Sequence, residues 1–231
     1  MRLLDAQYYK TPFYGVRKLT VWLRSLGYTI NRKRVKRLME LMGWQTLYRK
    51  PWLSKPNKEH KIYPYLLKGL DINQANQVWA MDITYVPMRR GFMYLCAVID
   101  LHTRYVVNWS VSNSMTAEWC SQMVAEAVEQ YGPPEILNTD QGSQFTSDEF
   151  ITQVKNKGIQ PSMDGKGRAI DNIFIERLWK TVKYEQIYLK VPDDGVQLYE
   201  GLNEYFSFYN SQRPHQSLGY KTPAMLYAKA A

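Results

Sequence analysis

Three carboxylates in this sequence lie where an acidic side chain needs a particular reason. Asp82 lies in the middle of an apolar, strand-like run, Asp140 directly follows a second such run, and Glu176 lies within a long helix-like stretch. An ionised carboxylate in a buried strand is costly unless a partner compensates its charge. A divalent cation would compensate it, so these three residues are candidates for a metal site.

Carboxylates of this kind suit the chemistry of phosphodiesters. Cleavage and strand transfer are in-line displacements at phosphorus, in which two Mg²⁺ ions about 3.5–4 Å apart can activate the attacking oxygen and stabilise the leaving one. Mg²⁺, with Mn²⁺ as a substitute, takes oxygen ligands and keeps waters and substrate phosphates as its other ligands. We therefore predict that Asp82, Asp140 and Glu176 are both the catalytic and the metal-binding residues.

The helix expected to carry Glu176 also carries basic residues. Four apolar residues recur at helical spacing and form its predicted core stripe: Ile175, Leu178, Trp179 and Val182. Glu176, Lys180 and Lys183 share an adjacent face, so both lysines are predicted to contact DNA phosphates. An ordinary Glu–Lys surface pair, worth roughly 0.2–0.5 kcal/mol, has the same spacing. The two aspartates favour the catalytic interpretation.

Other residues that could do chemistry are weaker candidates. Asp100 suits a turn, Asp164 a glycine-rich loop, and Asp171 the start of the long helix. The three histidines are dispersed and show no ligand spacing: His60, His102 and His215. The sequence contains no nucleophilic triad, phosphate-binding glycine-lysine motif or dinucleotide fingerprint. Metal-assisted phosphoryl transfer is therefore the chemistry that the residues favour.

Composition indicates a globular protein with one strongly basic end. Apolar residues make up 45% and charged residues 22%, which argues against wholesale disorder. Residues 1–70 contain 16 Lys and Arg against 3 Asp and Glu, whereas residues 71–231 contain 14 against 18. The basic end indicates an anionic polymer as partner. Cys96 and Cys120 match no zinc spacing and are expected to be reduced, buried thiols.

Residues 1–48 are predicted to form a small helical, helix-turn-helix-like DNA-binding domain. Apolar spacing favours helices at 14–26 and 32–42, with Asn31 capping the second helix. Five basic residues of the second helix are predicted to contact DNA: Arg32, Lys33, Arg34, Lys36 and Arg37. A solvated helix face is the alternative. Residues 49–76 form a basic, proline-containing linker that either follows a nucleic acid or is a plain surface segment.

Residues 77–190 alternate between strand and helix patterns. The expected strands span residues 78–87, 92–101, 105–111, 135–139 and 159–163. The expected helices span residues 116–131, 147–157 and 172–189, the first two capped by Thr116 and Ser147. The first three strands predict an antiparallel meander, and the whole order predicts an α/β mixed sheet flanked by helices. Residues 191–231 are expected to be a C-terminal helical extension with a helix at 195–208.

This pattern resembles a known family. Asp82, Asp140 and Glu176, with 35 residues between the last two, resemble the DDE triad of transposases and retroviral integrases. Lys183, seven residues after Glu176, matches the basic residue that those enzymes place against transposon-end DNA. Local strings resemble the bacterial insertion-sequence transposases that are translated by frameshifting between two overlapping reading frames: WAMDITY at 79–85, NTDQGSQF at 138–145 and DN at 171–172.

The resemblance covers nearly the whole chain. The strings YN at 209–210, RPH at 213–215, LGY at 218–220 and TP at 222–223 resemble the same family, as do YGVR at 14–17 and RVKRLM at 34–39. It implies a ribonuclease H-like catalytic core, Mg²⁺ as the metal, and a reaction of DNA end cleavage followed by strand transfer. Family members usually gain an upstream helix-turn-helix and leucine zipper from the first reading frame, so this chain resembles the second-frame product or a shortened form.

Partners and place follow from the resemblance. We expect binding to double-stranded DNA, at transposon ends and target, by a homo-oligomer, with the upstream reading-frame product as a further partner. We expect a bacterial, cytoplasmic, nucleoid-associated protein without membrane contact, since the apolar run 92–101 is too short to cross a bilayer. Two alternatives stay open: a catalytically inactive DNA-binding regulator, and a ribonuclease H-fold nuclease that does not join strands. Strand transfer into a target duplex discriminates between the enzymes.

Overall fold

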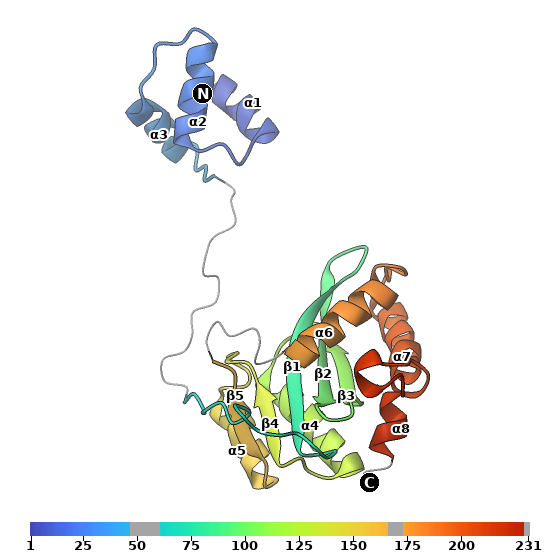
Figure 1. The fold of residues 1–231 in the computed structure, drawn as a ribbon. Coiled ribbons are helices and arrows are strands. Elements are labelled where there is room, and N and C mark those ends of the chain that lie inside the picture. The colour runs from blue at the N-terminus through green and yellow to red at the C-terminus, as the bar shows by residue number, and fades with distance from the viewer. Residues whose placement is uncertain (47–60, 166–172, 229–231) are drawn as a thin grey trace. The chain divides into compact units, whose positions relative to one another are not determined.

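The computed structural model describes residues 1–46, 61–165 and 173–228 (Figure 1). The chain divides into two compact units, Met1–Lys55 and Pro56–Ala231. Each unit has a hydrophobic core of its own.

The N-terminal unit contains the helices α1 (Arg2–Lys10), α2 (Val16–Ser25) and α3 (Arg32–Leu41). Its buried residues come from all three helices: Leu4, Leu19, Leu23, Val35 and Met39. The side chain of Asn31 accepts a hydrogen bond from the backbone N–H of Arg34 at 2.9 Å, as expected of its predicted capping role. The two predicted helices are thus confirmed with small shifts at their ends. Helix α1 has no counterpart among the predicted helices.

The second unit is built on a five-stranded mixed sheet in the order β3-β2-β1-β4-β5. Its strands are β1 (Val78–Pro87), β2 (Phe92–Asp100), β3 (Val106–Ser112), β4 (Ile136–Thr139) and β5 (Gln160–Met163). Strands β1, β2 and β3 pair antiparallel, so the predicted meander is confirmed. Strands β4 and β5 add to β1 in parallel. The carboxyl ends of β1, β4 and β5 therefore lie at the same edge of the sheet.

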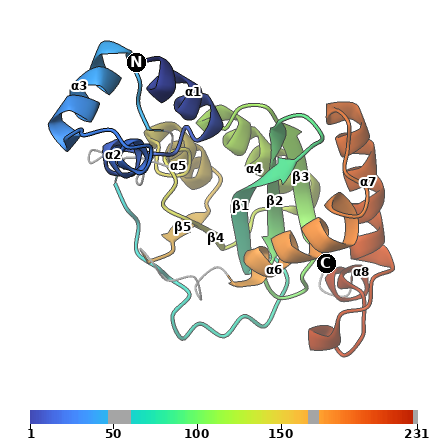
Figure 2. The same cartoon turned by 90° about the horizontal axis from the view of Figure 1, so that it is seen from above.

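Helices cover both faces of the sheet (Figures 1 and 2). On one face lie α4 (Ala117–Tyr131) and α5 (Asp148–Asn156), capped by Thr116 and Ser147 as predicted. On the other lie α6 (Ile173–Val182) and α7 (Gly195–Ser211). A short helix, α8 (Pro223–Tyr227), follows and buries Tyr227 in the cluster on the α4 side.

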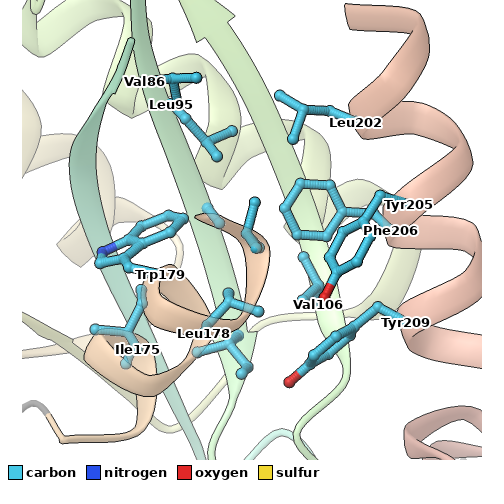
Figure 3. Packing of buried hydrophobic residues seen from close by; sticks show 14 of the residues in the cluster. Val86, Leu95, Val106, Ile175, Leu178, Trp179, Leu202, Tyr205, Phe206 and Tyr209 are labelled. Carbon is cyan, nitrogen blue, oxygen red and sulfur yellow. The ribbon is translucent and has the colours of Figure 1, made fainter. Parts of the chain in front are cut away.

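Successive side chains of β1 alternate between the two hydrophobic clusters on the two faces of the sheet. Val78, Ala80 and Val86 belong to the cluster that contains the buried residues of α6 and α7. Trp79 and Met81 belong to the cluster beneath α4 and α5. Since successive side chains of a strand point to opposite faces, Asp82 and Thr84 lie on the α6 side. Figure 3 shows this side, with Ile175, Leu178 and Trp179 of α6 packed against the sheet.

The helix predicted at 172–189 is shorter and less regular than the sequence pattern suggests. Its predicted start at residue 172 lies outside the described residues. The α-helical part ends at Val182, and a π-helical turn, Lys183–Ile187, continues it. The next buried apolar residue after Val182 is Ile187, five positions on, and the wider π turn, with its i→i+5 hydrogen bonds, lets both side chains pack in the same cluster. The helix predicted at 195–208 continues to Ser211.

Candidate active site

Strand pairing brings Asp82 and Asp140 to one edge of the sheet. In the parallel pairing of β1 with β4, Ala80 lies opposite Asn138. Two residues further along each chain are Asp82 and Asp140. In the pairing of β4 with β5, Thr139 lies opposite Met163, and the next residues are Asp140 and Asp164. Asp82 within β1, Asp140 directly after β4 and Asp164 directly after β5 therefore lie at the same level on neighbouring parallel strands.

The two predicted aspartates are held in an unfavourable electrostatic environment. Burial raises the pKa of Asp82 to about 6, the indole N–H of Trp179 opposes that rise, and the negative charges of Asp140 and Asp164 add to it. Burial also raises the pKa of Asp140, against the effect of a hydrogen bond from the Gly142 N–H. Carboxylates kept close together away from water are a donor set that a divalent cation would stabilise.

The loop after β4 fixes the Asp140 side chain. The backbone N–H of Gly142 donates to Asp140 Oδ1 at 2.8 Å. A Cβ atom at position 142 would lie 2.9 Å from that same oxygen and would also collide with the Gln144 amide. Only glycine therefore lets the backbone approach the carboxylate so closely. The Gly142 carbonyl then accepts from the backbone N–H of Phe145, whose ring is fully buried.

A buried polar network supports the same edge, and sequence reasoning missed it. Asn138 donates to Asp164 Oδ1 at 2.7 Å, and Ser162 donates to Asn138 Oδ1 at 2.8 Å. Gln141 donates to the Asp164 carbonyl at 2.7 Å, and the Leu66 N–H donates to Ser162 Oγ at 3.0 Å. Asp164 was assigned only to a glycine-rich loop. The available signal was a polar residue, Asn138 or Ser162, inside each of two short, buried strands.

Glu176 lies in the first turn of α6, and its side chain is exposed. The helix is attached to the site one turn later, where the Trp179 indole donates to Asp82 Oδ2 at 2.8 Å. Within residues 1–46, 61–165 and 173–228, no three His, Cys, Asp or Glu residues are grouped so that they could hold a metal ion. The structure thus brings Asp82 and Asp140 together but does not complete a metal-binding group with Glu176.

The two lysines predicted on α6 and its continuation differ in their surroundings. Lys183 is partly buried and donates to Thr84 Oγ1 at 2.7 Å, two residues along β1 from Asp82. Burial lowers the pKa of Lys183, and the negative charge of Asp82 partly offsets that. Lys180 is exposed. Lys183 therefore places a positive charge beside the aspartates, whereas Lys180 extends into solvent.

Comparisons with known proteins cover the same regions. The family described as integrase core domain matches residues 72–169, a second family of that description matches residues 157–223, and an HTH-like domain matches residues 1–52. The transposase for insertion sequence element IS904 of Lactococcus lactis subsp. lactis strain IL1403 is 33% identical over 225 residues, which cover 91% of this chain and 85% of the relative. The chain belongs to the insertion-sequence transposases.

A second transposase and two solved viral integrase structures are also similar to this chain. The putative transposase InsK for insertion sequence element IS150 of Escherichia coli strain K12 is 30% identical over 214 residues, which cover 91% of this chain and 76% of the relative. The fold recurs in a solved HTLV-2 integrase catalytic core domain, with a TM-score of 0.55, 20% identity, and coverage of 67% of this chain and 97% of that one. A simian T-cell lymphotropic virus intasome chain gives a TM-score of 0.60 at 16% identity, covering 92% of this chain and 74% of that one. The predicted ribonuclease H-like fold is confirmed.

The HTH-like unit of this transposase exposes its basic helix. All five predicted DNA-contacting residues of α3 are exposed: Arg32, Lys33, Arg34, Lys36 and Arg37. Val35 and Met39 point inward. Lys36 lies 3.7 Å from Glu40, an exposed i,i+4 pair of the kind that contributes little to stability. The remaining basic surface is available to an anionic partner.

The other candidates have structural roles or lie outside the described residues. Asp100 is fully buried and accepts from the Thr103 N–H, the Thr103 hydroxyl and the Asn76 N–H, at 2.7–2.8 Å, as expected of a turn former. Cys96 and Cys120 are buried free thiols, as predicted. Asp171 and His60 lie outside the described residues. In the described part of the chain, no helix has the length and apolar character needed to cross a membrane.

Proposed function

We propose that the chain cuts the ends of its insertion sequence and joins them to target DNA, as a polynucleotidyl transferase whose catalytic residues are Asp82, Asp140 and Glu176. The observation that carries this proposal is the pair of half-buried aspartates on the adjacent parallel strands β1 and β4, Asp82 within β1 and Asp140 directly after β4. Burial and, to a lesser degree, the charge of Asp140 raise the pKa of Asp82 to about 6 in a chain of transposase ancestry. Such perturbed carboxylates are characteristic of functional sites.

The residues fit Mg²⁺ as the metal, with Mn²⁺ as a substitute. Carboxylate oxygens are the donors that such hard cations take, and the solved HTLV-2 integrase core domain with this fold is in complex with magnesium. Asp82 and Asp140 would hold the two ions, with Glu176 as the third protein ligand. When bound, the metal supplies activation of the attacking oxygen and stabilisation of the leaving oxygen.

Residues around the aspartates orient the site. The Trp179 N–H holds one oxygen of Asp82, and the Gly142 N–H holds one oxygen of Asp140. The ammonium of Lys183 lies where it can attract a phosphate toward the carboxylates. Lys180, exposed one turn after Glu176, extends this attraction along α6. The two lysines would attract a negatively charged DNA strand toward the carboxylates. The positive charge of the metal would then offset the repulsion between the strand and the carboxylates.

Partners follow from the same proposal. The exposed basic residues of α3 contact the phosphates of double-stranded DNA at transposon ends and target. Joining two ends requires more than one active site, so we infer a homo-oligomer on DNA. The similar viral proteins were solved as a dimeric core domain and as an intasome. The upstream reading-frame product is a further proposed partner, and the cytoplasmic nucleoid is the proposed location.

A strand-transfer assay tests the proposal. The full chain is incubated with Mg²⁺, a duplex ending in the terminal repeat, and a supercoiled target. Asp82→Asn should lower cleavage and joining by at least about a thousandfold, because metal-ion catalysis is worth several kcal/mol. Its affinity for DNA should stay within about twofold. Asp148→Asn is the matched control, since Asp148 is an exposed aspartate on α5.

The outcomes separate the alternatives. Joining by Asp82→Asn at the wild-type rate would contradict the assignment of Asp82. Cleavage by the wild-type chain without joining would indicate a ribonuclease H-fold nuclease. DNA binding without either reaction would indicate an inactive regulator.

A further inference from the structure

A basic pocket lies on α6, outside the acidic site. It has a volume of about 540 Å³ and lies between α6, the end of α7 with the chain that follows it, and the turn between β2 and β3. Its basic lining residues are Arg104, Arg177, Arg213 and His215. Arg104 and Arg213 are 109 positions apart in the sequence, so the pocket exists only in the folded chain.

Arg104 is held in this pocket at a cost. Its guanidinium lies 3.6 Å from the ring centre of Phe174, and its buried Nη1 has no hydrogen-bond partner among the described residues. Burial lowers the pKa of Arg104, Tyr209 and Asp100 partly offset that effect, and the positive charge of Arg177 adds to it. A buried donor without a partner is uncommon and destabilising. A ligand that accepts hydrogen bonds and carries negative charge would relieve this cost.

The acidic groups near the pocket are already engaged. Glu185 accepts from Arg213 Nε at 2.8 Å and Nη2 at 2.7 Å, and from the Tyr205 hydroxyl at 2.8 Å. Asp100, near Arg104, is bound within its own turn. Burial and the charge of Arg213 lower the pKa of His215 to about 4, so it is neutral near pH 7. Arg104 and Arg177 therefore give the pocket its positive charge.

The remaining lining suits a phosphate group. Gln216 and Ser217 line the pocket and offer amide and hydroxyl donors beside the two guanidinium groups, whereas the Thr181 hydroxyl donates to the Arg177 carbonyl at 2.8 Å. Arginine forks with neighbouring hydroxyls match the oxygens of a phosphate. We propose that this pocket binds a phosphodiester group of the DNA strand that the transposase acts on. The identification of the ligand as DNA rests on the proposed function.

Helix geometry explains how one strand reaches both sites. At 3.6 residues per turn, Arg177 and Thr181 lie on one flank of α6, and Glu176 and Lys183 lie on the other. The core stripe separates these flanks on the buried side. On the exposed side the side chain of Lys180 lies between Glu176 and Arg177. A strand that crosses the exposed face can therefore place one phosphate near the aspartates and another in the pocket.

DNA binding without metal tests the pocket. The affinity of the full chain for a random-sequence duplex is measured in EDTA at several salt concentrations. Arg177→Gln should weaken binding about tenfold at low salt and reduce the slope of log affinity against log salt by about one, as expected for one lost phosphate contact. Ser217→Glu, which puts a carboxylate into the pocket, should weaken binding at least as much. Lys190→Gln, an exposed cation away from the pocket lining, is the control.

Each outcome decides the inference. Both substituted residues are exposed, and thermal melting verifies that the variants fold. If Arg177→Gln and Ser217→Glu bind with the affinity and salt slope of Lys190→Gln, or if the wild-type chain does not bind DNA, the inference is wrong. Because the assay contains no metal, it does not depend on catalysis. If strand transfer fails but DNA binding still depends on the pocket, only the proposed function is contradicted.

Discussion

The two flanks of α6 differ in the sign of the charge that they hold. On the flank of Trp179, half-buried Asp82 is close to Asp140, and its burial, with a further contribution from the like charge of Asp140, raises the pKa of Asp82 to about 6. On the other flank, Arg104 and Arg177 share the pocket, and burial lowers the pKa of Arg104. Each flank keeps a partly buried charge, Asp82 or Arg104, near a like charge, which costs stability unless an opposite charge binds. The pair of flanks thus fits a metal ion on one side and a phosphate on the other.

The flanks also differ in how firmly their charges are held. Asp82 and the strand before Asp140 belong to the sheet, where pairing fixes the backbone. Arg177 is an exposed side chain on a helix, and Arg213 follows the end of α7. Rigid ligands favour the strict geometry that Mg²⁺ demands. The long, exposed side chain of Arg177 can reach a phosphate in more than one position.

The largest expected effect concerns the stability of the chain and arises at the flank of α6 that faces Asp82 and Asp140, here called the acidic flank. Because the folded pKa of Asp82 is about 6 against an ordinary value of 3.8, the free energy of unfolding decreases as pH rises from 3.8 to 6 and stays lower above that. Asp82→Asn removes the charge and keeps an acceptor for Trp179. In EDTA at pH 8 it should stabilise the chain by on the order of 2 kcal/mol, or about 5 °C in Tm.

Thermal melting at pH 8 and pH 4 measures this effect. The gain should disappear at pH 4, where Asp82 is protonated in the folded chain. Added Mg²⁺ should raise the Tm of the wild-type chain more than that of Asp82→Asn. A variant that melts below the wild type at pH 8 would show that the acidic flank is not under electrostatic strain.

A smaller effect is expected from the contact between α6 and the acidic flank. Trp179→Phe keeps the ring packing but removes the N–H that lowers the pKa of Asp82. Strand transfer near pH 7 should fall about tenfold, since a hydrogen bond to a charged group is worth about 1.5–3 kcal/mol. The loss should shrink as pH rises, because the carboxylate then ionises without the bond.

The pH profile separates this role from packing. Trp119→Phe is the control, because it removes an indole hydrogen bond from α4 to Ser110 on β3, away from Asp82. An equal loss for Trp179→Phe at every pH from 6 to 9 would assign Trp179 a structural role alone.

The smallest effect on stability is expected from His215, at the flank of α6 that faces Arg104 and Arg177, here called the basic flank. Its folded pKa of about 4 lies below the ordinary 6.5, so the unfolded chain binds the proton more readily, and stability decreases as pH falls from 6.5 to 4. His215→Gln should lose less stability over that range. The difference should stay below about 1 kcal/mol because the ring is only half-buried. Urea unfolding at pH 7 and 4.5 measures it, and equal losses in both chains would contradict it.

Local pattern explains what could be predicted from the sequence. The strands β1 to β3 and the caps Thr116 and Ser147 follow from alternation and capping chemistry within short windows. Asp82 and Asp140 follow from their positions on strand patterns. Convergence of Glu176 with them stays a prediction, as do the domain boundaries at 48, 76 and 190.

Pairing over long distances explains what was missed. Asp164 joins the acidic edge through the pairing of β4 with β5, which its own neighbours in the sequence do not reveal. The π turn after Val182 depends on packing of Ile187 in the cluster shared with α7. The basic pocket combines a turn near residue 104 with a segment near residue 215. Secondary-structure patterns alone contain no information about such juxtapositions.

The turn that carries Arg104 has a consequence for engineering. Arg104 has a φ of 65°, a backbone region that asparagine and glycine adopt more readily than arginine. A turn selected for thermostability alone would carry one of those residues. In the proposed phosphate pocket, arginine at this position sacrifices some stability for binding, so stabilising designs should leave it unchanged.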